Sequence, residues 1–314
     1  MDLLTPTPEQ ALFGLRAMKT LALVDGPLDA AELHLLESIQ RVLGTSHPLD
    51  QLAPITPAEL ASALPDPRIR RQLVQGLIVM SLIDREPRPE EADLVEQFAQ
   101  AVNVSVPEVA DLRLALAGDI FRLRLDLGRR FWAADKVKEI WNEEGLRGMF
   151  HFVRSALGRE DPATAARYQA LEKYPAGSLG RSYFEYCRSN GFPLPGEKGG
   201  TPEIVLYHDC THLLSGYGTT PEGEVQVACF SAGYRKKDPF AFVFFVLLQF
   251  HVGVRMTPIT AAQTGFFDPE KALIALRRGA AMNVDLTDGW EYWPVMGEQV
   301  EELRKRYNIP PLAQ

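Results

Sequence analysis

The sequence predicts an all-α protein. Apolar side chains recur at three- and four-residue spacings along most of the 314-residue chain, and no long segment alternates apolar and polar residues as a half-buried strand does. A pattern of helix, acidic turn and helix also occurs twice in the first third. Because the length exceeds that of most single domains, we expect two helical domains, at residues 1–115 and 116–314.

Charge and cysteine content narrow the classes of function. Residues 1–112 carry 17 acidic and 8 basic side chains, whereas residues 113–314 carry 24 and 25. Phosphate binding needs clustered Lys and Arg, so we expect no nucleic-acid partner. The three cysteines lack paired spacing, and the N-terminus lacks the features of a signal peptide. These observations predict a cytoplasmic protein.

The N-terminal repeat begins with a helical hairpin over residues 9–44 that breaks at Asp25-Gly26-Pro27. Aligning Asp25 with Asp84 pairs Glu32 with Glu91, which indicates a duplication at a 59-residue offset. Each glutamate follows a turn by the spacing of a helix cap, so capping explains both. The alternative is a weakly held divalent cation bound by Asp25, Asp84, Glu32 and Glu91.

The centre of the chain reads as further helices. We expect a helical connector over residues 107–130, and helices over residues 131–172 with Trp132, Trp141 and Phe150 in the core. The apolar run that starts at Phe240 falls short of the roughly 20 residues that span a bilayer. It predicts a buried helix over residues 240–254, and the alternative is the wall of a lipid channel or a membrane-contacting helix.

The segment HDCTH contains the strongest functional pattern. His208 and His212 are four residues apart, so both imidazoles lie on one helix face and can reach one cation. Asp209 is near enough to coordinate or to orient. Gly216 and Gly218 end the helix, and a new helix beginning at Glu224 would return a carboxylate to the pair.

Such a set suits Zn²⁺ first, and also Fe²⁺, Mn²⁺, Co²⁺ or Mg²⁺. The alternative explanations are ordinary. Histidine pairs at this spacing are common on helices, and a glutamate at a helix start is favourable to the helix dipole. The full spelling HDxxH, followed by eleven residues and Glu224, favours the metal site.

Two resemblances follow from these residues. The turns LALVDG and SLID, with Glu32 and Glu91 after them, resemble the TerB-like helical domain over approximately residues 9–110. Members of that family typically act as membrane-linked interaction or signalling modules. HDCTH with Glu224, between YPAGSLGRSYFEYC and GWEYWPVMGEQVEELRKRYNIPP, resembles the Coq-four family of coenzyme Q (ubiquinone) biosynthesis over approximately residues 120–310.

The Coq-four resemblance implies an all-helical domain with a hydrophobic tunnel for a polyprenyl tail, and a metal bound by His208, Asp209, His212 and Glu224. It implies peripheral membrane association and contacts with other quinone-biosynthesis enzymes. The activity implied is metal-dependent oxidative decarboxylation, in which hydroxyl replaces the C1 carboxylate of a prenylated hydroxybenzoate-type precursor. The alternative is a non-catalytic prenyl-lipid-binding scaffold, and a hydrolase by analogy with HExxH enzymes is a weaker third.

For the enzyme hypothesis we assign catalytic roles to Asp209 and Glu224. A substrate carboxylate needs a cationic side chain near the site. The candidates are Arg181 and one of the basic triplet at residues 235–237. Phenolic hydrogen bonds and apolar contacts complete the expected substrate site, and core packing is the alternative for the same side chains: Tyr183, Tyr207, Phe240 and Phe244. The partners considered are a prenylated quinone precursor or other polyprenyl lipid, a membrane surface and a second copy of the chain.

Overall fold

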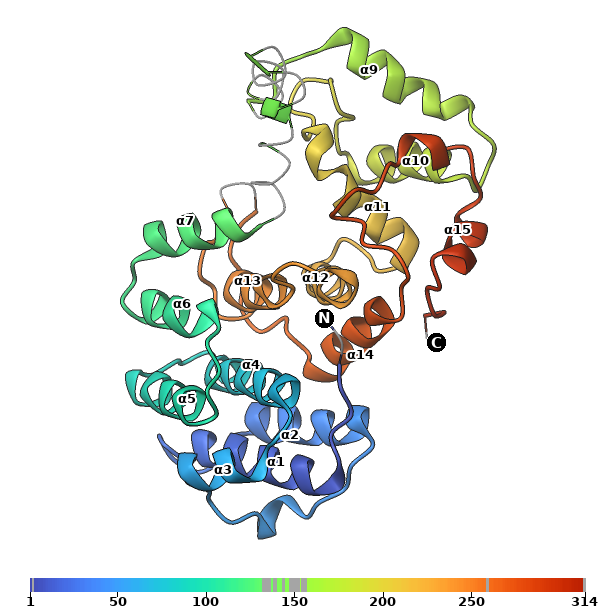
Figure 1. The fold of residues 1–314 in the computed structure, drawn as a ribbon. Coiled ribbons are helices and arrows are strands. Elements are labelled where there is room, and N and C mark those ends of the chain that lie inside the picture. Colours follow the sequence, from blue (N-terminus) through green and yellow to red (C-terminus); the bar gives the residue numbers. More distant parts are fainter. Residues whose placement is uncertain are drawn as a thin grey trace. The chain divides into compact units, whose positions relative to one another are not determined.

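The computed structural model describes residues 1, 3–131, 137, 140–142, 145, 146, 153, 157–257 and 260–312. Helices joined by turns and loops make up this part of the chain (Figure 1). Its only extended pairings are isolated bridges, Ser178 with Gln299 and Val252 with Thr264. The predicted all-α class is therefore confirmed.

The chain divides into two compact units. Unit 1 comprises Met1–Leu127, Thr220–Gly233 and Pro239–Ala280, and unit 2 comprises Gly128–Thr219, Tyr234–Asp238 and Ala281–Gln314. Two helices have residues in both units, α7 (Ile120–Arg130) and α12 (Pro221–Tyr234). The units are defined by contacts, so the boundary after residue 115, which separates sequence modules, stays a prediction.

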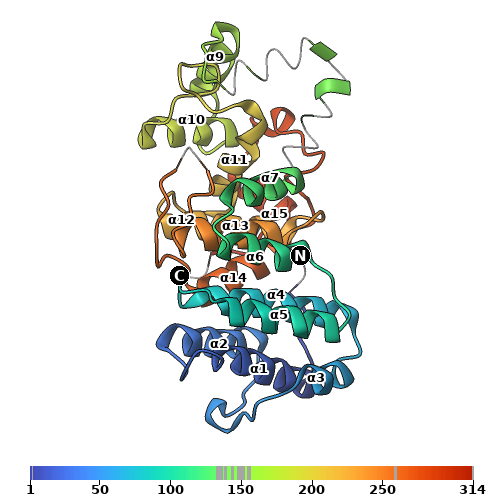
Figure 2. The same ribbon diagram turned by 90° about the vertical axis from the view of Figure 1, so that its left-hand side faces the viewer.

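Unit 1 combines the N-terminal helices with helices from much later in the chain. In it, α14 packs against α2 and α13 packs against α4, and both views show α1, α2, α4 and α5 stacked as neighbours (Figures 1 and 2). Late segments therefore complete the N-terminal core. The helices are α1 (Pro8–Ala22), α2 (Ala30–Leu43), α3 (Pro57–Ala63), α4 (Pro67–Ile83), α5 (Pro89–Ala101), α6 (Pro107–Leu116), α13 (Phe240–Phe250) and α14 (Pro269–Ala280), with the short 3-10 helix η1 (Leu49–Gln51).

Both glutamates of the repeat act as helix caps. The Asp29 amide donates to Glu32 Oε2 at 2.8 Å, and the Glu32 amide donates to Asp29 Oδ1 at 2.7 Å. In the second copy the Arg88 amide donates to Glu91 Oε2 at 3.0 Å. Both carboxyls are buried, and burial is the main cause that raises the pKa of Glu32 to about 7 and that of Glu91 to about 8. Neighbouring carboxylates of the two turns raise both values further.

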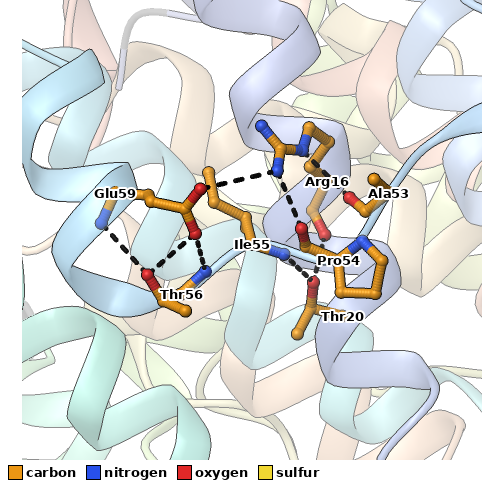
Figure 3. A network of polar contacts seen from close by, with 7 residues as sticks. All are labelled: Arg16, Thr20, Ala53, Pro54, Ile55, Thr56 and Glu59. Atoms are coloured by element: carbon orange, nitrogen blue, oxygen red, sulfur yellow. Dashed lines mark hydrogen bonds and ion pairs between the residues drawn. The ribbon is translucent and has the colours of Figure 1, made fainter.

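The loop before α3 is tied to α1 by a polar network (Figure 3). The Arg16 guanidinium donates from Nε to the carbonyl of Ala53 at 2.9 Å and from Nη2 to that of Pro54 at 2.7 Å. The Ile55 amide donates to Thr20 Oγ1 at 2.9 Å. These bonds satisfy backbone groups that no helix pairs, so the loop keeps a fixed path along α1.

A buried histidine joins α13 to α4. His251 follows α13, and its Nε2 lies 2.8 Å from the carbonyl oxygen of Ile83 at the end of α4. Its Nδ1 accepts a hydrogen bond from the Phe267 amide at 3.3 Å, so Nε2 carries the proton. Burial lowers the pKa of this imidazole. His251 is a structural residue of unit 1.

α12 and α14 approach each other closely at two glycines. A Cβ on Gly279 would overlap the backbone of Phe230, and one on Gly233 would overlap the backbone at Leu276 and Ala280. Only a residue without a side chain allows this crossing. The same contact holds the part of α12 that belongs to unit 1.

Unit 2 is built around α10 and α11. α10 packs against α11 and η2, and α11 packs against α15. The C-terminal segment is pinned to the start of α10, since the Leu179 and Gly180 amides donate to the carbonyls of Glu298 and Met296, both at 2.8 Å. The elements are α9 (Pro162–Gln169), η2 (Ala170–Lys173), α10 (Leu179–Asn190), η3 (Glu203–Val205), α11 (Leu206–Ser215), η4 (Trp293–Val295) and α15 (Val300–Arg306).

Four local predictions need correction or fall outside the described residues. The connector over residues 107–130 is two helices, α6 and α7, because Gly118 takes a left-handed φ of 68° between them. α12 begins at Pro221, before Glu224, and α13 ends at Phe250. Trp141 is 53% exposed rather than in the core, and Trp132 and Phe150 lie outside the described residues.

The membrane question has a limited answer. No helix in the described ranges is both long enough and apolar enough to cross a bilayer. α13 is the most apolar helix, and it ends after 11 residues with nearly every side chain buried.

The raised pKa of Glu91 predicts a pH-dependent stability. The folded state holds this proton up to about pH 8, whereas the unfolded state releases it near the ordinary value of 4.5. The free energy of unfolding therefore falls as pH rises between these values. We expect Glu91→Gln, which keeps an acceptor for the Arg88 amide, to melt higher than wild type by a margin that grows from pH 5 to pH 9. Circular dichroism at several pH values measures this margin. Exposed Glu90→Gln is the control, and a margin independent of pH would contradict the prediction.

Candidate metal centre

The HDCTH segment forms the middle of α11. The helix ends where Gly216 adopts a left-handed φ of 82°, and the Gly216 amide donates to the carbonyl of His212 at 2.9 Å. Glycine suits this position because other residues are strained at positive φ. His208 and His212 thus occupy successive turns of one helix face, as predicted, with His212 buried and His208 half-buried.

The two imidazoles converge through the same ring atom. His208 Nε2 and His212 Nε2 lie 3.3 Å apart, and the ring planes are nearly perpendicular at 89°. His212 Nδ1 lies 3.1 Å from the carbonyl oxygen of Tyr217, to which it donates. That bond leaves the lone pair of His212 on Nε2, the atom that faces His208.

The spacing of these nitrogens fits a shared cation. Zinc–nitrogen bonds are about 2.0–2.1 Å long, so two nitrogens at a tetrahedral angle lie roughly 3.3–3.4 Å apart. The 3.3 Å separation of the two Nε2 atoms matches this value. A second feature points the same way, because a carbonyl partner on the other ring nitrogen is typical of metal-bound histidines.

Glu224 completes a group of three. One ligand atom from each of His208, His212 and Glu224 lies within 4.8 Å of the others. The carboxylate comes from the first turn of α12 and is half-buried. Two histidines and a carboxylate form a donor set for a divalent metal ion. The acidic residues of the repeat, Asp25, Asp84, Glu32 and Glu91, do not form such a group.

A pair of buried hydroxyl groups, from Thr211 and Tyr234, stabilises α11. Thr211 Oγ1 donates to the carbonyl of Tyr207 at 2.7 Å, and it lies 3.1 Å from the hydroxyl of Tyr234, the last residue of α12. All three atoms are in unit 2 and buried. Thr211, one of the two variable residues of the HDxxH pattern, thus stabilises the position of α11. Tyr186 of α10 stacks on His212 with ring centres 5.8 Å apart.

Asp209 lies outside the group of three, and its predicted role as a ligand stays a prediction. Its charge acts on α10, where burial first, and then Asp209, raises the pKa of Tyr183 far above its usual range. Burial also raises the pKa of the Cys187 thiol to about 12, and Asp209 adds to the effect. Burial, with a smaller contribution from Asp209, therefore keeps both side chains protonated.

Tyr183 has an unusual hydroxyl. The side chain is fully buried, and the hydroxyl has no oxygen or nitrogen partner among the described residues, only the weakly hydrogen-bonding thiol of Cys187. A buried polar group without a partner costs about 1–3 kcal/mol. By contrast, the neighbouring Tyr168, whose ring lies 6.0 Å away, donates to Glu203 Oε1 at 2.7 Å.

Arg181 and Arg235, two candidates for the partner of a substrate carboxylate, both bond backbone carbonyls, Arg235 those of Lys237 and Arg130, so the choice between them stays a prediction. Arg181 Nε donates to Glu185 Oε1 at 2.6 Å, and its Nη1 bonds the carbonyl of Glu172. Arg235 is only 3% exposed and interacts electrostatically with Tyr207, the buried tyrosine before His208. Burial lowers the pKa of Arg235, and Tyr207 and Asp285 oppose that change. Lys236 and Lys237 are exposed.

The two predicted phenylalanines belong to unit 1. Phe240 lines an apolar cavity there, and Phe244 is fully buried in the core. The predicted substrate residues are thus divided, since Arg181, Tyr183 and Tyr207 lie in unit 2. Their role in binding substrate stays a prediction.

Sequence reasoning missed the groups that support the histidines. The Tyr217 carbonyl has no sequence signal, because every residue carries one. Tyr186 and Tyr234 lie 26 residues before and 22 residues after His212, so their contacts depend on helix packing. Among these features the sequence indicated only one, the end of the helix at Gly216, after which the chain turns back beside His212.

Comparisons with known proteins add no relative. The chain matches no protein-family model and no curated protein. The resemblances to the TerB-like and Coq-four families therefore remain predictions that depend on the motifs, and the candidate metal centre stands on its own geometry.

Proposed function

We propose that this protein binds a divalent cation, most simply Zn²⁺, through His208, His212 and Glu224 and carries out a decarboxylation step of ubiquinone biosynthesis. The observation that carries the proposal is the convergence of two Nε2 atoms at 3.3 Å beside a carboxylate. Three protein ligands are the usual number in catalytic zinc sites, which keep a position for water or substrate.

The proposed reaction replaces the ring carboxylate of a prenylated hydroxybenzoate by hydroxyl. The bond between ring and carboxyl carbon breaks and CO2 leaves, a water molecule supplies the hydroxyl oxygen at that ring carbon, and two electrons with two protons pass to dioxygen, which becomes hydrogen peroxide. A bound cation supplies Lewis-acid stabilisation of the electron-rich ring oxygen. We assign proton transfer to the carboxylates of Asp209 and Glu224 and binding of the substrate carboxylate to the buried Arg235.

The buried hydroxyl of Tyr183, which has only the Cys187 thiol beside it, supports a ring ligand in unit 2. It is held protonated, so it acts as a donor, and a phenol or carboxylate of the substrate would supply the missing acceptor. A polyprenyl tail would bring this substrate from a membrane surface. Peripheral association and contact with other quinone-biosynthesis enzymes are part of the same proposal.

A non-catalytic scaffold is the second candidate. It is favoured if Asp209, which follows His208 directly, supplies a fourth ligand, because structural zinc sites are closed by four protein groups. The metal would then stabilise unit 2 around a bound prenyl lipid. The acidic N-terminal module would recruit partners.

Metal content tests the site itself. We expect wild-type protein purified without added metal to hold about one divalent ion per chain, and His212→Ala to hold less than about a tenth of that, because the fixed Nε2 ligand is lost. Elemental analysis measures both. His34→Ala, which changes a half-exposed histidine on α2, is the control and keeps the metal. Equal metal in wild type and His212→Ala would refute the site.

Release of CO2 separates enzyme from scaffold. A prenylated hydroxybenzoate labelled at its carboxylate should release labelled CO2 in air with wild-type protein, and release should stop without dioxygen or in His208→Ala. A wild-type protein that holds metal and binds the substrate but releases no CO2 would rule out the decarboxylase and leave the scaffold.

Tyr183→Phe tests the ring site. Because the only protein partner of the hydroxyl among the described residues is the weakly bonding Cys187 thiol, we expect a nearly unchanged or higher melting temperature together with a KM raised about threefold to tenfold, the worth of one hydrogen bond. Tyr168→Phe is the matched control. It breaks the bond to Glu203, so it should lower the melting temperature and leave KM unchanged. Loss of stability in Tyr183→Phe with unchanged KM would contradict the assignment.

A further inference from the structure

Unit 1 contains an apolar cavity of about 140 Å³, separate from the residues of the candidate metal centre. Its walls come mainly from α1, α2, α4, α12, α13 and α14, together with the extended segment before α1. A void of about 150 Å³ lined by aliphatic side chains stays dry and takes up a molecule the size of benzene. The cavity therefore has room for about six carbons of a hydrocarbon.

The lining excludes a polar ligand from the interior. The lining residues with polar side chains are Gln10, Thr45, Gln72, Gln75 and the thiol of Cys229. The Gln72 amide is already used, since its Oε1 accepts from the Leu4 amide at 2.8 Å and its Nε2 donates to the Leu4 carbonyl at 3.0 Å. These two bonds pin the N-terminal segment, whose Leu3 and Pro6 line the cavity.

Two glycines in the middle of helices enlarge this cavity. Gly14 lies within α1 and Gly76 within α4, and both line the cavity. A glycine inside a helix is less favourable than alanine, so a reason for it is expected.

Close packing is not that reason. A Cβ on Gly14 would lie 3.7 Å from Leu73 Cδ1, and one on Gly76 would lie 3.7 Å from Met18 Cε, both ordinary contact distances. At Gly279, by contrast, a Cβ would overlap backbone atoms. A methyl group would fit at both positions, and both glycines line the cavity, so their missing side chains leave part of the apolar volume unfilled, although protein interiors normally fill such space.

We propose that this cavity of unit 1 is a binding site for the hydrocarbon chain of a lipid, and that Gly14 and Gly76 keep it open. The ligand class is an acyl or isoprenoid chain whose terminal carbons enter between α1 and α4. The site uses no residue of the candidate metal centre and shares only Phe240 with the predicted substrate residues, so the loss of metal or of decarboxylation would leave it standing.

Fluorescence titration with cis-parinaric acid, a fluorescent acyl chain, tests the site in the full-length protein. We expect saturable binding by wild type, and competition by palmitic acid or farnesol, with the stronger competitor identifying an acyl or an isoprenoid ligand. Gly76→Leu should weaken binding at least about tenfold, because a single methylene in an apolar pocket is worth that much. No saturable binding by the folded wild type would overturn the proposal.

The double variant Gly14→Ala/Gly76→Ala guards against misfolding of Gly76→Leu. We expect it to melt about 2–4 °C higher for each alanine while binding the probe more weakly. Gly128→Ala, at an open position of α7, is the control and should gain stability with unchanged binding. His212→Ala should lose metal and keep the probe. Equal probe binding by wild type and both cavity variants would refute the site.

Discussion

The hydrogen bond between His212 and the carbonyl of Tyr217 is the constraint on which the candidate metal centre depends. It selects the tautomer of His212, directs the Nε2 lone pair at His208 and ties α11 to the loop that leads to α12. The bond exists because α11 stops at Gly216, where the left-handed backbone turns the chain back beside the helix. Buried His251 differs, because protein groups use both of its ring nitrogens and leave none for a ligand.

Polar groups are buried in both units, but they are satisfied in different ways. Glu32 and Glu91 are occupied by backbone amides, and their raised pKa values show that burial opposes ionisation although each caps a helix. The duplication places like charges near each other, and the ion pair between Arg88 and Asp25 at 2.9 Å offsets part of this repulsion. The Tyr183 hydroxyl of unit 2 has no backbone partner of this kind among the described residues and has only the Cys187 thiol beside it.

Glycines mark three different requirements in this chain. Gly216 supplies a left-handed backbone, Gly279 permits the crossing of α12 and α14, and Gly14 and Gly76 preserve volume. The distinction comes from what an added Cβ would meet. Backbone overlap indicates a packing requirement, whereas ordinary contact beside open space indicates that the space itself is used.

The sequence by itself determined the features that depend on residues within a few positions of one another. The all-α class, the capping of α2 and α5, the shared face of His208 and His212 and the end of α11 at Gly216 are of this kind. Only the tertiary structure decided the rest. These other features involve segments far apart in the chain. They are the packing of α13 against α4 and of α14 against α2, the aromatic and hydroxyl partners of α11, the burial of Tyr183, and the cavity beside Gly14 and Gly76. A local pattern states which face of a helix is apolar, but the helix that covers this face is chosen by the folding of the whole chain.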